Sequence, residues 1–477
     1  LSLYLDGRLV SSADQDKTIQ DVLPEGDVFG YIGKSLYTPD ALLTANLSGF
    51  KIYKGALNQE EIKESLPSGE EKSQMVLADI LEAVKGENAS LDAVTEDLNL
   101  PEKIDNVAVT WGTWDETDVI AKDGTVSAPL DQQAEVTIPF SYTVDGTTYD
   151  QEIKVTVLPL DVDAELTEAL ASIDIPNKDD IRGNITLPEE SENGIPVVWS
   201  TDHEEIVNVN KIESTDGYDD TPAGTVTRPS KDTAVTMTAS LTLNGKTVTK
   251  DIVLTVKAAP KAIEESDYTD YFFAYFAGEG YADGEQIYFA SSQDGLDWDD
   301  LNNNKPVLTS TLGEKGVRDP FIIRSPEGDK FYLIATDLKI NGGNGWGAAQ
   351  TAGSQSLMVW ESTDLIHWSD ERMVEVSADI GAGCTWAPEA TYDEKTGEYV
   401  VYWASKVEGD GYAKQRVYYA KTRDFYTFTE PEVFIDYDES SIDTTIIKGD
   451  DGYYYRYTKN EGGNTNELGA KTKTVVV

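Results

Sequence analysis

Short runs in which apolar and polar residues alternate, separated by turn residues, dominate the chain. An alternation with a period of two residues is typical of β-strands that bury one face. Three segments place Asp-Gly or Asn-Gly between two such runs, which predicts tight hairpins: "LYLDGRLV" at 3–10, "TVDGTTYDQEIKVTV" at 143–157 and "TLNGKTVTKDIVLTV" at 242–256. The pattern therefore predicts an all-β protein whose helices are few and short.

Two repeats follow one another in the first half of the chain, and we call residues 71–159 the first repeat and residues 160–258 the second repeat. Each contains a short amphipathic helix, a strand with a Trp (Trp111, Trp199), a Gly-Thr-Val step and a closing hairpin. The offset between them is 88 residues at the Trp and 100 at the Gly-Thr-Val step, so the second repeat carries an insertion near "KIESTDGYDD". Both resemble the atrophied immunoglobulin-like domains of bacterial cell-surface proteins. The resemblance implies β-sandwiches that serve as spacers or, alternatively, bind glycans or proteins, and we favour the spacer.

Residues 1–66 contain "LYLDGRLV", "GYIGKS" and "GFKIYKGALNQEEI" in that order. These segments resemble the closing strands of a laminin-G-like, concanavalin-type domain, a jelly-roll lectin-like fold. The match covers only part of such a domain. The end of this domain is therefore expected before the first repeat.

Aromatic residues become dense in residues 266–477, which we call the C-terminal region. The segments "YFASSQDGLDW", "VWESTDLIHW" and "YAKTRDFYTF" repeat the pattern aromatic-x-x-Ser/Thr-x-Asp-x-x-x-aromatic, as in a propeller of four-stranded blades. Two complete blades are expected from 318 and from 385 onward, with a third beginning at 441. An earlier blade is expected to use "YFFAYFAG", "EQIYFASSQDGLDW" and "PVLTS" and to lack its first strand, which the other end of the propeller could supply.

Each of the three predicted first strands has a carboxylate near its start: Asp319 in "RDP", Glu389 in "WAPE" and Asp443 in "SID". The first strands of propeller blades line the central channel. Three carboxylates in register would therefore converge on one acidic pocket. One of them alone would carry little weight, because Asp before Pro is common in turns.

These three motifs, in this order and spacing, resemble the successive blades of glycoside hydrolase family 43. The resemblance implies a five-bladed β-propeller, here partial, and hydrolysis with inversion, mostly of arabinofuranosides, arabinans and xylosides. It implies that Asp319 is the general base and that Asp443 tunes the pKa of the general acid and positions the sugar. Trp386 and Glu389 would line the pocket without transferring a proton.

The same resemblance places the general acid, a Glu, about one blade beyond Asp443. The glutamates that follow Asp443 are Glu461 and Glu467, and both fall in the loop-like segment "KNEGGNTNEL". We therefore expect the acid beyond Val477 and little or no activity from these 477 residues alone. The chain also begins and ends in strand-like sequence, which we interpret as part of a longer protein.

Three further residues are candidates for the pocket or its surroundings. Arg318 is expected to form an ion pair that orients Asp319, or else to bind a sugar hydroxyl. Trp346, in a Gly-rich segment, could stack on a sugar ring or pack the loop. We expect His367 to be structural and Cys384 to fill a buried gap.

The charge narrows the possible partners. With 87 acidic and 38 basic residues, the formal net charge is −49, which argues against nucleic acid and anionic membranes. Two His and one Cys leave little for a zinc site, a Ser-His-Asp triad or disulfides. We expect no required cofactor, although a structural Ca²⁺ is possible, and no membrane insertion. The expected protein is a monomer at the bacterial cell surface or outside the cell.

Two classes of function remain open at this point. The first is an enzyme that cleaves arabinose- or xylose-containing plant cell-wall polysaccharide. The second is a non-catalytic glycan-binding or adhesion protein whose propeller has lost activity. Fructan hydrolysis of the family 32 type is a weaker third possibility, because "RDP" also occurs in that related group.

Overall fold

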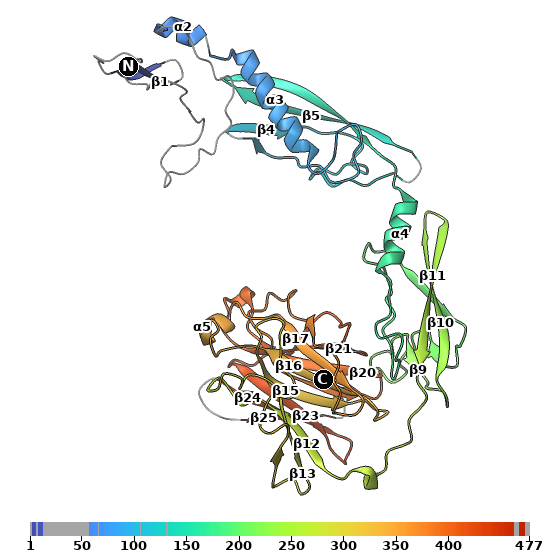
Figure 1. Ribbon diagram of the computed structural model, residues 1–477. Helices are drawn as coiled ribbons and strands as arrows, with labels where there is room; N and C mark the ends of the chain where they lie inside the picture. Colours follow the sequence, from blue (N-terminus) through green and yellow to red (C-terminus); the bar gives the residue numbers. More distant parts are fainter. Residues whose placement is uncertain are drawn as a thin grey trace, which may run out of the picture. The chain divides into compact units, whose positions relative to one another are not determined.

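The computed structural model describes residues 2–5, 8–12, 57–64, 66–104, 106–129, 132–461 and 467–472. These residues fall into two compact units, 1–161 and 162–477 (Figure 1). Both units are built mainly of β-strands, so the prediction of an all-β protein with few helices is confirmed. Of the expected laminin-G-like part, the hairpin β1 (Ser2–Leu5) and β2 (Arg8–Ser12) and the helix α2 (Gln59–Glu64) are described. Most of the other segments on which that resemblance rests lie outside the described residues.

The first repeat is a helix packed on a four-stranded sheet. Its helix α3 (Gly69–Lys85) begins with a capping box formed by Ser68 and Glu71. The strands are β3 (Lys103–Ile104), β4 (Val107–Trp111), β5 (Ala134–Val144) and β6 (Thr147–Val157), in that order across the sheet. Ile80 and Val84 of the helix are fully buried in the core that these strands form.

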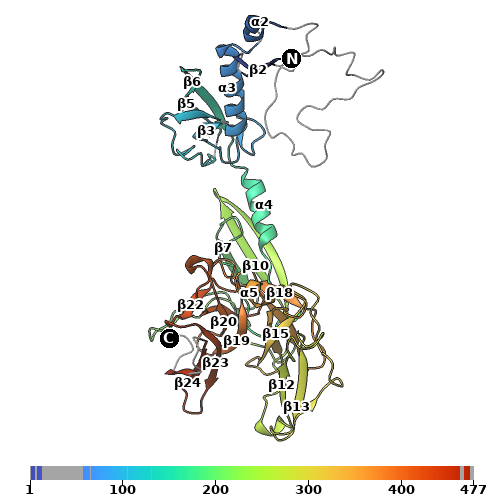
Figure 2. The same cartoon turned by 90° about the vertical axis from the view of Figure 1, so that its left-hand side faces the viewer.

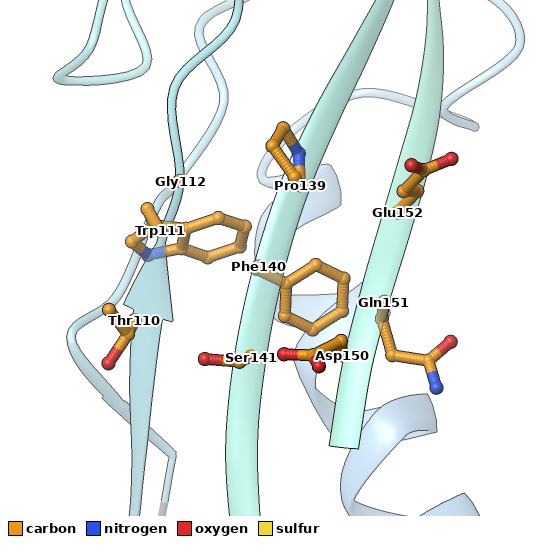
Figure 3. Close-up of a pocket in the computed structure, with 9 residues that line it drawn as sticks. All are labelled: Thr110, Trp111, Gly112, Pro139, Phe140, Ser141, Asp150, Gln151 and Glu152. Atoms are coloured by element: carbon orange, nitrogen blue, oxygen red, sulfur yellow. The ribbon is translucent and has the colours of Figure 1, made fainter. Parts of the chain in front are cut away.

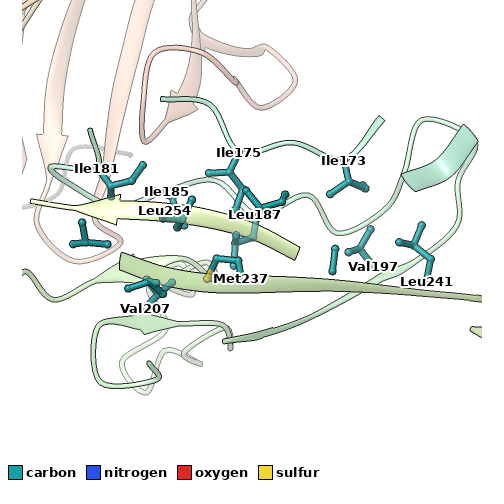
Figure 4. Close-up of a cluster of buried hydrophobic side chains, with 14 of the residues drawn as sticks. Ile173, Ile175, Ile181, Ile185, Leu187, Val197, Val207, Met237, Leu241 and Leu254 are labelled. Carbon is teal, nitrogen blue, oxygen red and sulfur yellow. The ribbon is translucent and has the colours of Figure 1, made fainter. Parts of the chain in front are cut away.

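The second repeat has a similar arrangement, with a shorter helix, a three-stranded main sheet and a separate two-stranded sheet. Its elements are the helix α4 (Val162–Ser172) and the strands β7 (Val197–Thr201), β8 (Val207–Asn208), β9 (Thr225–Val226), β10 (Thr233–Leu243) and β11 (Lys246–Val256). In the main sheet β10 lies between β7 and β11. Figure 4 shows its core, where Met237 and Leu254 from the sheet face Ile175, Ile185 and Leu187 from the segment after α4.

Details of the two repeats match closely. The indole N–H of Trp111 donates to the Pro101 carbonyl at 3.0 Å, and that of Trp199 donates to the Pro188 carbonyl at 2.9 Å. Both hairpins turn through two residues with positive φ, Asp145-Gly146 and Asn244-Gly245. Positive φ at both positions defines the type I′ turn, so these two turn predictions are confirmed.

The C-terminal region consists of four successive antiparallel sheets, each with its strands in sequence order. The views in Figure 1 and Figure 2 show these sheets gathered in one body. Their strands are β12 (Tyr271–Tyr275), β13 (Tyr288–Ser292) and β14 (Asp299–Asp300); β15 (Val317–Arg324), β16 (Phe331–Asp337), β17 (Ser356–Ser362) and β18 (Arg372–Glu375); β19 (Trp386–Asp393), β20 (Glu398–Ser405), β21 (Arg416–Thr422) and β22 (Glu432–Ile435); and β23 (Ser441–Lys448), β24 (Tyr454–Asn460) and β25 (Glu467–Thr472). The helical segments are η1 (Glu265–Asp267), α5 (Gly345–Ala349) and η2 (Glu408–Asp410).

The first strands of the sheets, β12, β15, β19 and β23, are neighbours in this order. The two complete four-stranded sheets agree with the prediction. The earliest sheet differs from the prediction in two ways. Its first strand is present, because "YFFAY" forms β12 beside β15, and its outer strand is β14 and not "PVLTS". That segment makes one isolated bridge, Leu308 to Ile287.

The repeated Ser/Thr-x-Asp motif forms the same turn in three sheets. In each case the hydroxyl of Ser292, Ser362 or Thr422 accepts hydrogen bonds from backbone N–H groups two and three residues later. The carboxylates of Asp294, Asp364 and Asp424 accept hydrogen bonds from the backbone N–H groups two and three residues after each Asp. The motif is therefore structural, as its regular recurrence indicates.

Candidate active site

A β-bulge interrupts each of the three first strands at the same place. The pairing shifts between Arg318 and Phe321 in β15, between Trp386 and Glu389 in β19, and between Ile442 and Thr445 in β23. In each bulge one residue other than Gly has a left-handed backbone, with φ of 49° at Asp319, 49° at Ala387 and 52° at Asp443. Such conformations are costly and concentrate at functional sites, where bulges also redirect side chains.

This geometry corrects the expectation that three carboxylates lie in register. Asp319 and Asp443 occupy equivalent bulge positions, but the equivalent residue of β19 is Ala387. Glu389 lies two residues further along its strand, at the position of Phe321 and Thr445. The proline in "WAPE" matches the proline in "RDP", so a motif comparison that includes it would have revealed the offset.

One pocket nevertheless collects all three carboxylates. It has a volume of about 200 Å³ and is lined by Asp319, Pro320, Phe321, Ala387, Pro388, Glu389 and Asp443. The first strands of three neighbouring sheets thus contribute to one acidic cavity. The three carboxylates therefore converge as the sequence predicts, but they occupy two different positions along their strands: Asp319 and Asp443 one, and Glu389 the other.

Asp319 is held by one hydrogen bond from a neighbouring strand. The hydroxyl of Thr336, which is fully buried in β16, donates to Asp319 Oδ2 at 3.0 Å. The same hydroxyl accepts the Ala387 N–H at 2.8 Å, so it links the bulges of β15 and β19. Burial raises the pKa of Asp319; the Thr336 hydrogen bond opposes this rise and the charge of Asp443 adds to it.

Asp443 has a more open environment. Its carboxylate accepts a hydrogen bond from Lys459 Nζ at 3.0 Å, and the two side chains are 45 % and 47 % exposed. Lys459 also pairs with Glu461 at 2.7 Å. Asp443 is therefore a charged wall of the pocket that solvent can reach, whereas Asp319 is partly buried.

The pKa of Glu389 is also raised. Burial raises its pKa to about 7, and the charge of Asp443 adds to this, against hydrogen bonds from Thr445 and Tyr402. The Tyr402 hydroxyl, fully buried in β20, lies 3.4 Å from Glu389 Oε2. Near neutral pH this carboxyl group therefore holds a proton for part of the time, as a general acid or a hydrogen-bond donor to a sugar must.

We expect Glu389→Gln to remove a pH dependence of folding stability. A carboxyl whose pKa is higher in the folded state binds its proton more tightly there, so the free energy of unfolding falls as pH rises from about 4.5 to about 7. Gln does not titrate, and the variant should lose this part of the decline. Urea denaturation at pH 5 and pH 8 measures it, with Glu375→Gln, at an exposed position of β18, as control. An equal decline in Glu389→Gln and in the control would contradict the raised pKa.

Arg318, Trp346 and Trp386 lie together. The Arg318 guanidinium lies over the Trp346 ring at 4.9 Å, and the rings of Trp346 and Trp386 meet edge to face at 6.0 Å. Trp346 belongs to the short helix α5 and not to a loop, and it is 42 % exposed. Because Arg318 and Trp386 immediately precede pocket residues in their strands, this group stands beside the acidic pocket.

The expected ion pair between Arg318 and Asp319 is not formed. Arg318 Nη1 instead donates to Glu279 and Glu285, each at 2.9 Å. Glu285 is only 1 % exposed and also accepts the N–H groups of Ile340 and Asn341. Arg318 acts on Asp319 through its charge, and Thr336 is the residue that orients the carboxylate.

Three residues of the site were missed in the sequence: Thr336, Tyr402 and Lys459. The first two are polar side chains inside strands that are otherwise buried and apolar, "FYLIATD" and "YVVYWAS". A polar residue in such a strand needs a hydrogen-bond partner, and that need is a usable signal. Lys459 gives no comparable signal, because a lysine in a partly exposed strand is common.

The remaining candidates take no part in the pocket. His203 pairs with Glu205, and His367, which is 85 % exposed, pairs with Asp364 in a turn after β17. Cys384 is fully buried, as expected. Within the described ranges, no group of three or more His, Cys, Asp or Glu side chains is arranged to hold a metal ion. None of the helices in that part of the chain has the length and apolar character needed to cross a membrane.

A larger hollow, of about 620 Å³, lies on the first repeat. Figure 3 shows its lining, in which Trp111 of β4 and Phe140 of β5 lie side by side with ring centroids 5.2 Å apart. Asp150, Gln151 and Glu152 of β6 border it. It lacks the strained bulges and equivalent carboxylates of the acidic pocket, which we therefore take as the candidate site.

Comparison with protein families gives two matches. Residues 266–476 match the model of a "Probable glycosyl hydrolase domain" related to glycoside hydrolase family 43. Residues 163–259 match the model of the "Atrophied bacterial Ig domain". These ranges correspond to the C-terminal region and to the second repeat.

Among curated proteins, the chain is 32 % identical over 475 residues to an alpha-L-arabinofuranosidase of Bifidobacterium longum subsp. longum. The match covers 92 % of this chain but only 42 % of that protein. Solved structures with some likeness include a thermostable family-43 glycoside hydrolase (21 % identity, TM-score 0.24, covering 32 % of this chain and 44 % of the other) and an endo-arabinase from Bacteroides thetaiotaomicron (14 % identity, TM-score 0.34, covering 53 % and 95 %). Such TM-scores are too low to carry a conclusion. The C-terminal region is therefore similar to glycosyl hydrolase domains related to family 43, and the chain spans less than half the length of the curated relative that it matches.

Proposed function

We propose that the C-terminal region is part of a five-bladed propeller that cleaves α-L-arabinofuranosidic or related xylosidic linkages in plant polysaccharide with inversion. The observation that carries this proposal is the equivalent placement of Asp319 and Asp443. Both stand in left-handed bulges of first strands, β15 and β23, which flank β19, and both face one pocket. The curated arabinofuranosidase relative supports the choice of sugar. We further propose that the longer protein acts outside the bacterial cell or at its surface.

Asp319 is the proposed general base. Inverting hydrolysis requires one carboxylate to activate water and a protonated acid on the other side of the sugar. Asp319 is the more buried of the two bulge carboxylates, and Thr336 fixes one of its oxygens, which leaves the other to accept a proton from water. Asp443 adds negative charge, which favours the protonated form of a nearby acid.

The proposed general acid lies in a further blade beyond Val477. Glu389 is the alternative, because its pKa is raised to about 7. The two possibilities differ in one respect that can be measured. If the acid lies elsewhere, these 477 residues bind the sugar but turn over little substrate, whereas an acid at Glu389 gives appreciable turnover.

The test compares the 477-residue chain with a longer protein that continues through the next blades, using a nitrophenyl α-L-arabinofuranoside. We expect turnover by the longer protein and little or none by the 477-residue chain. Turnover by the chain that disappears in Glu389→Gln would move the acid to Glu389. Nitrophenyl β-D-xyloside and sucrose serve as competing substrates for the xylosidase and fructan alternatives.

A non-catalytic glycan-binding protein remains the second candidate. It predicts that the longer protein binds arabino-oligosaccharide without hydrolysing it. Calorimetric binding together with no release of reducing sugar would support this alternative against the enzyme.

A further inference from the structure

The second repeat contacts the C-terminal region through a buried ion pair. Arg228 donates to both carboxylate oxygens of Asp329, each at 2.8 Å, and Arg182 donates to Oδ2 of the same residue at 2.8 Å. Asp329 lies in the turn between β15 and β16. The side chains of Arg228 and Asp329 are only 3 % and 18 % exposed. A bidentate pair with so little exposure is geometrically specific, unlike an ordinary surface salt bridge.

A third arginine crosses the contact in the other direction, from the C-terminal region to the second repeat. Arg423, after β21, is 4 % exposed. It donates to three carbonyl oxygens of the second repeat, those of Ile185 (3.3 Å), Pro222 (3.0 Å) and Ala223 (2.7 Å). A guanidinium so deeply buried is stable only where hydrogen-bond acceptors surround it. The second repeat supplies most of the carbonyl oxygens to which Arg423 donates.

The insertion of the second repeat also takes part in this contact. Thirteen positions separate Trp111 from Gly124 in the first repeat, but twenty-five separate Trp199 from Gly224. Within the added length, Asp216 pairs with Lys395 at 2.8 Å and Asp219 pairs with Lys421. The insertion therefore places carboxylates opposite lysines of the C-terminal region.

The first repeat lacks the groups that make these contacts. Counting from the strand bridges of Val94 and Ile181, the positions of Arg182 and Asn184 are Thr95 and Asp97. Counting from the Gly-Thr-Val step, the position of Arg228 is Ala128.

Asn184 shows the difference most clearly. Its side-chain oxygen accepts the Val226 N–H at 2.9 Å, as Asp97 accepts the Val126 N–H at 2.7 Å. Its amide nitrogen also donates to the Gly397 carbonyl of the C-terminal region at 2.9 Å. A carboxylate at this position has no such donor. Asn184 thus keeps the contact common to both repeats and adds one to the neighbouring domain.

The contact reaches two neighbouring first strands at the ends away from the pocket. Asp329 follows β15 and Gly397 follows β19, while Asp319 and Ala387 stand near the starts of the same strands. Because the second repeat binds the turns that follow both strands, it holds β15 and β19 at a fixed distance from each other. The acidic pocket lies between residues of these two strands and of β23.

We propose that the second repeat is a dedicated docking domain whose partner is the C-terminal region of its own chain. It binds the turns after β15 and β19 through Asp329, Lys395 and Gly397, and the turn after β21 through Arg423, whereas the first repeat is not built for this surface. This assignment replaces the spacer role expected for the second repeat, and it holds whether or not the proposed glycosidase function is correct.

The test cuts the connection and asks whether the parts remain together. A site for a specific protease is inserted between the exposed residues Lys261 and Ala262 of the full 477-residue chain, and the folded protein is cleaved. We expect the two pieces to elute together in size-exclusion chromatography at micromolar concentration in 0.15 M salt. The double variant Arg182→Thr/Arg228→Ala, with the residues of the first repeat, should weaken this association by about a hundredfold or more.

A matched control removes two positive charges that pair within the second repeat. Lys178 and Lys246 pair with Asp174 and Asp163 of the second repeat itself, so Lys178→Thr/Lys246→Ala should leave the pieces associated. Asp329→Ala tests the contact from the other side and should act like the double arginine variant. Circular dichroism before cleavage verifies that each variant is folded. Separation of the unsubstituted pieces, or association of both contact variants as tight as that of the control, would overturn the proposal.

Discussion

Asp319→Asn is expected to lower kcat on an aryl α-L-arabinofuranoside by about a thousandfold in a longer protein that is active, because general-base catalysis contributes about 10²–10⁴-fold. Asn is the informative replacement, since it tolerates the left-handed backbone of this bulge and its side-chain oxygen can still accept the Thr336 hydroxyl. It cannot take a proton from water. Stability should therefore change little while turnover collapses.

The control for this variant is Asp299→Asn, at an exposed position in β14. Thermal melts verify that both variants remain folded. A kcat within about threefold of the unsubstituted protein would show that Asp319 is not the base. The raised pKa of Asp319 also predicts that kcat/KM falls with decreasing pH at a higher pH than an ordinary aspartate would give. A pH profile of kcat/KM for the unsubstituted protein measures this decline.

Gly224→Ala is expected to destabilise the second repeat by about 3 kcal/mol or more, because it combines backbone strain with a direct clash. Gly224 has φ of +94°, and a Cβ atom there would lie 2.2 Å from the Ile185 carbonyl oxygen. That carbonyl is backbone and cannot move aside as a flexible side chain could. The Ile185 N–H also donates to the Gly224 carbonyl at 2.9 Å, so the two segments are tied together at this point.

Gly245→Ala is the matched control for this substitution. Gly245 also has positive φ, +74°, but no atom lies within 4 Å of an added Cβ. Its replacement should therefore cost only the backbone strain, about 1–2 kcal/mol. Chemical denaturation followed by circular dichroism measures both variants. An equal loss in the two would show that the clash at Gly224 is relieved by local movement.

The same substitution can be made in the first repeat. Gly124 has φ of +97°, and an added Cβ would lie 2.1 Å from the Leu98 carbonyl oxygen. The Gly-Thr-Val step recognised in the sequence thus has a physical reason: both repeats bring a backbone carbonyl against this position. A Gly that recurs at equivalent places in two repeats is a sound sequence signal for close backbone approach.

Much of the local structure follows from residue patterns. The helices α3 and α4, the hairpins with Asp145-Gly146 and Asn244-Gly245, and the two complete four-stranded sheets occur where alternation and turn residues predict them. These features depend on neighbours within a few residues. Asp-Gly and Asn-Gly adopt positive φ readily, and alternation aligns one face of a strand with a core.

The site could be located from the sequence but not built from it. The motifs around Asp319 and Asp443 identified two strand starts that do contribute to one pocket. The bulges that offset Glu389 could not be inferred from alternation, because an extra residue in a strand changes which side chains share a face. The pairing of Arg318 with Glu279 and Glu285 depends on segments more than thirty residues earlier in the chain.

Strand periodicity, turn chemistry and an acidic, carboxylate-based site were therefore readable from the order of residues, since each reflects short-range preferences or side-chain type. The link from Thr336 to Asp319 and Ala387, and the contact of Arg182 and Arg228 with Asp329, arise from segments distant in sequence that packing brings within hydrogen-bond distance. Such contacts produce no periodic pattern of residues in the sequence. Their energy depends on burial and geometry, which exist only once the domains have folded against each other.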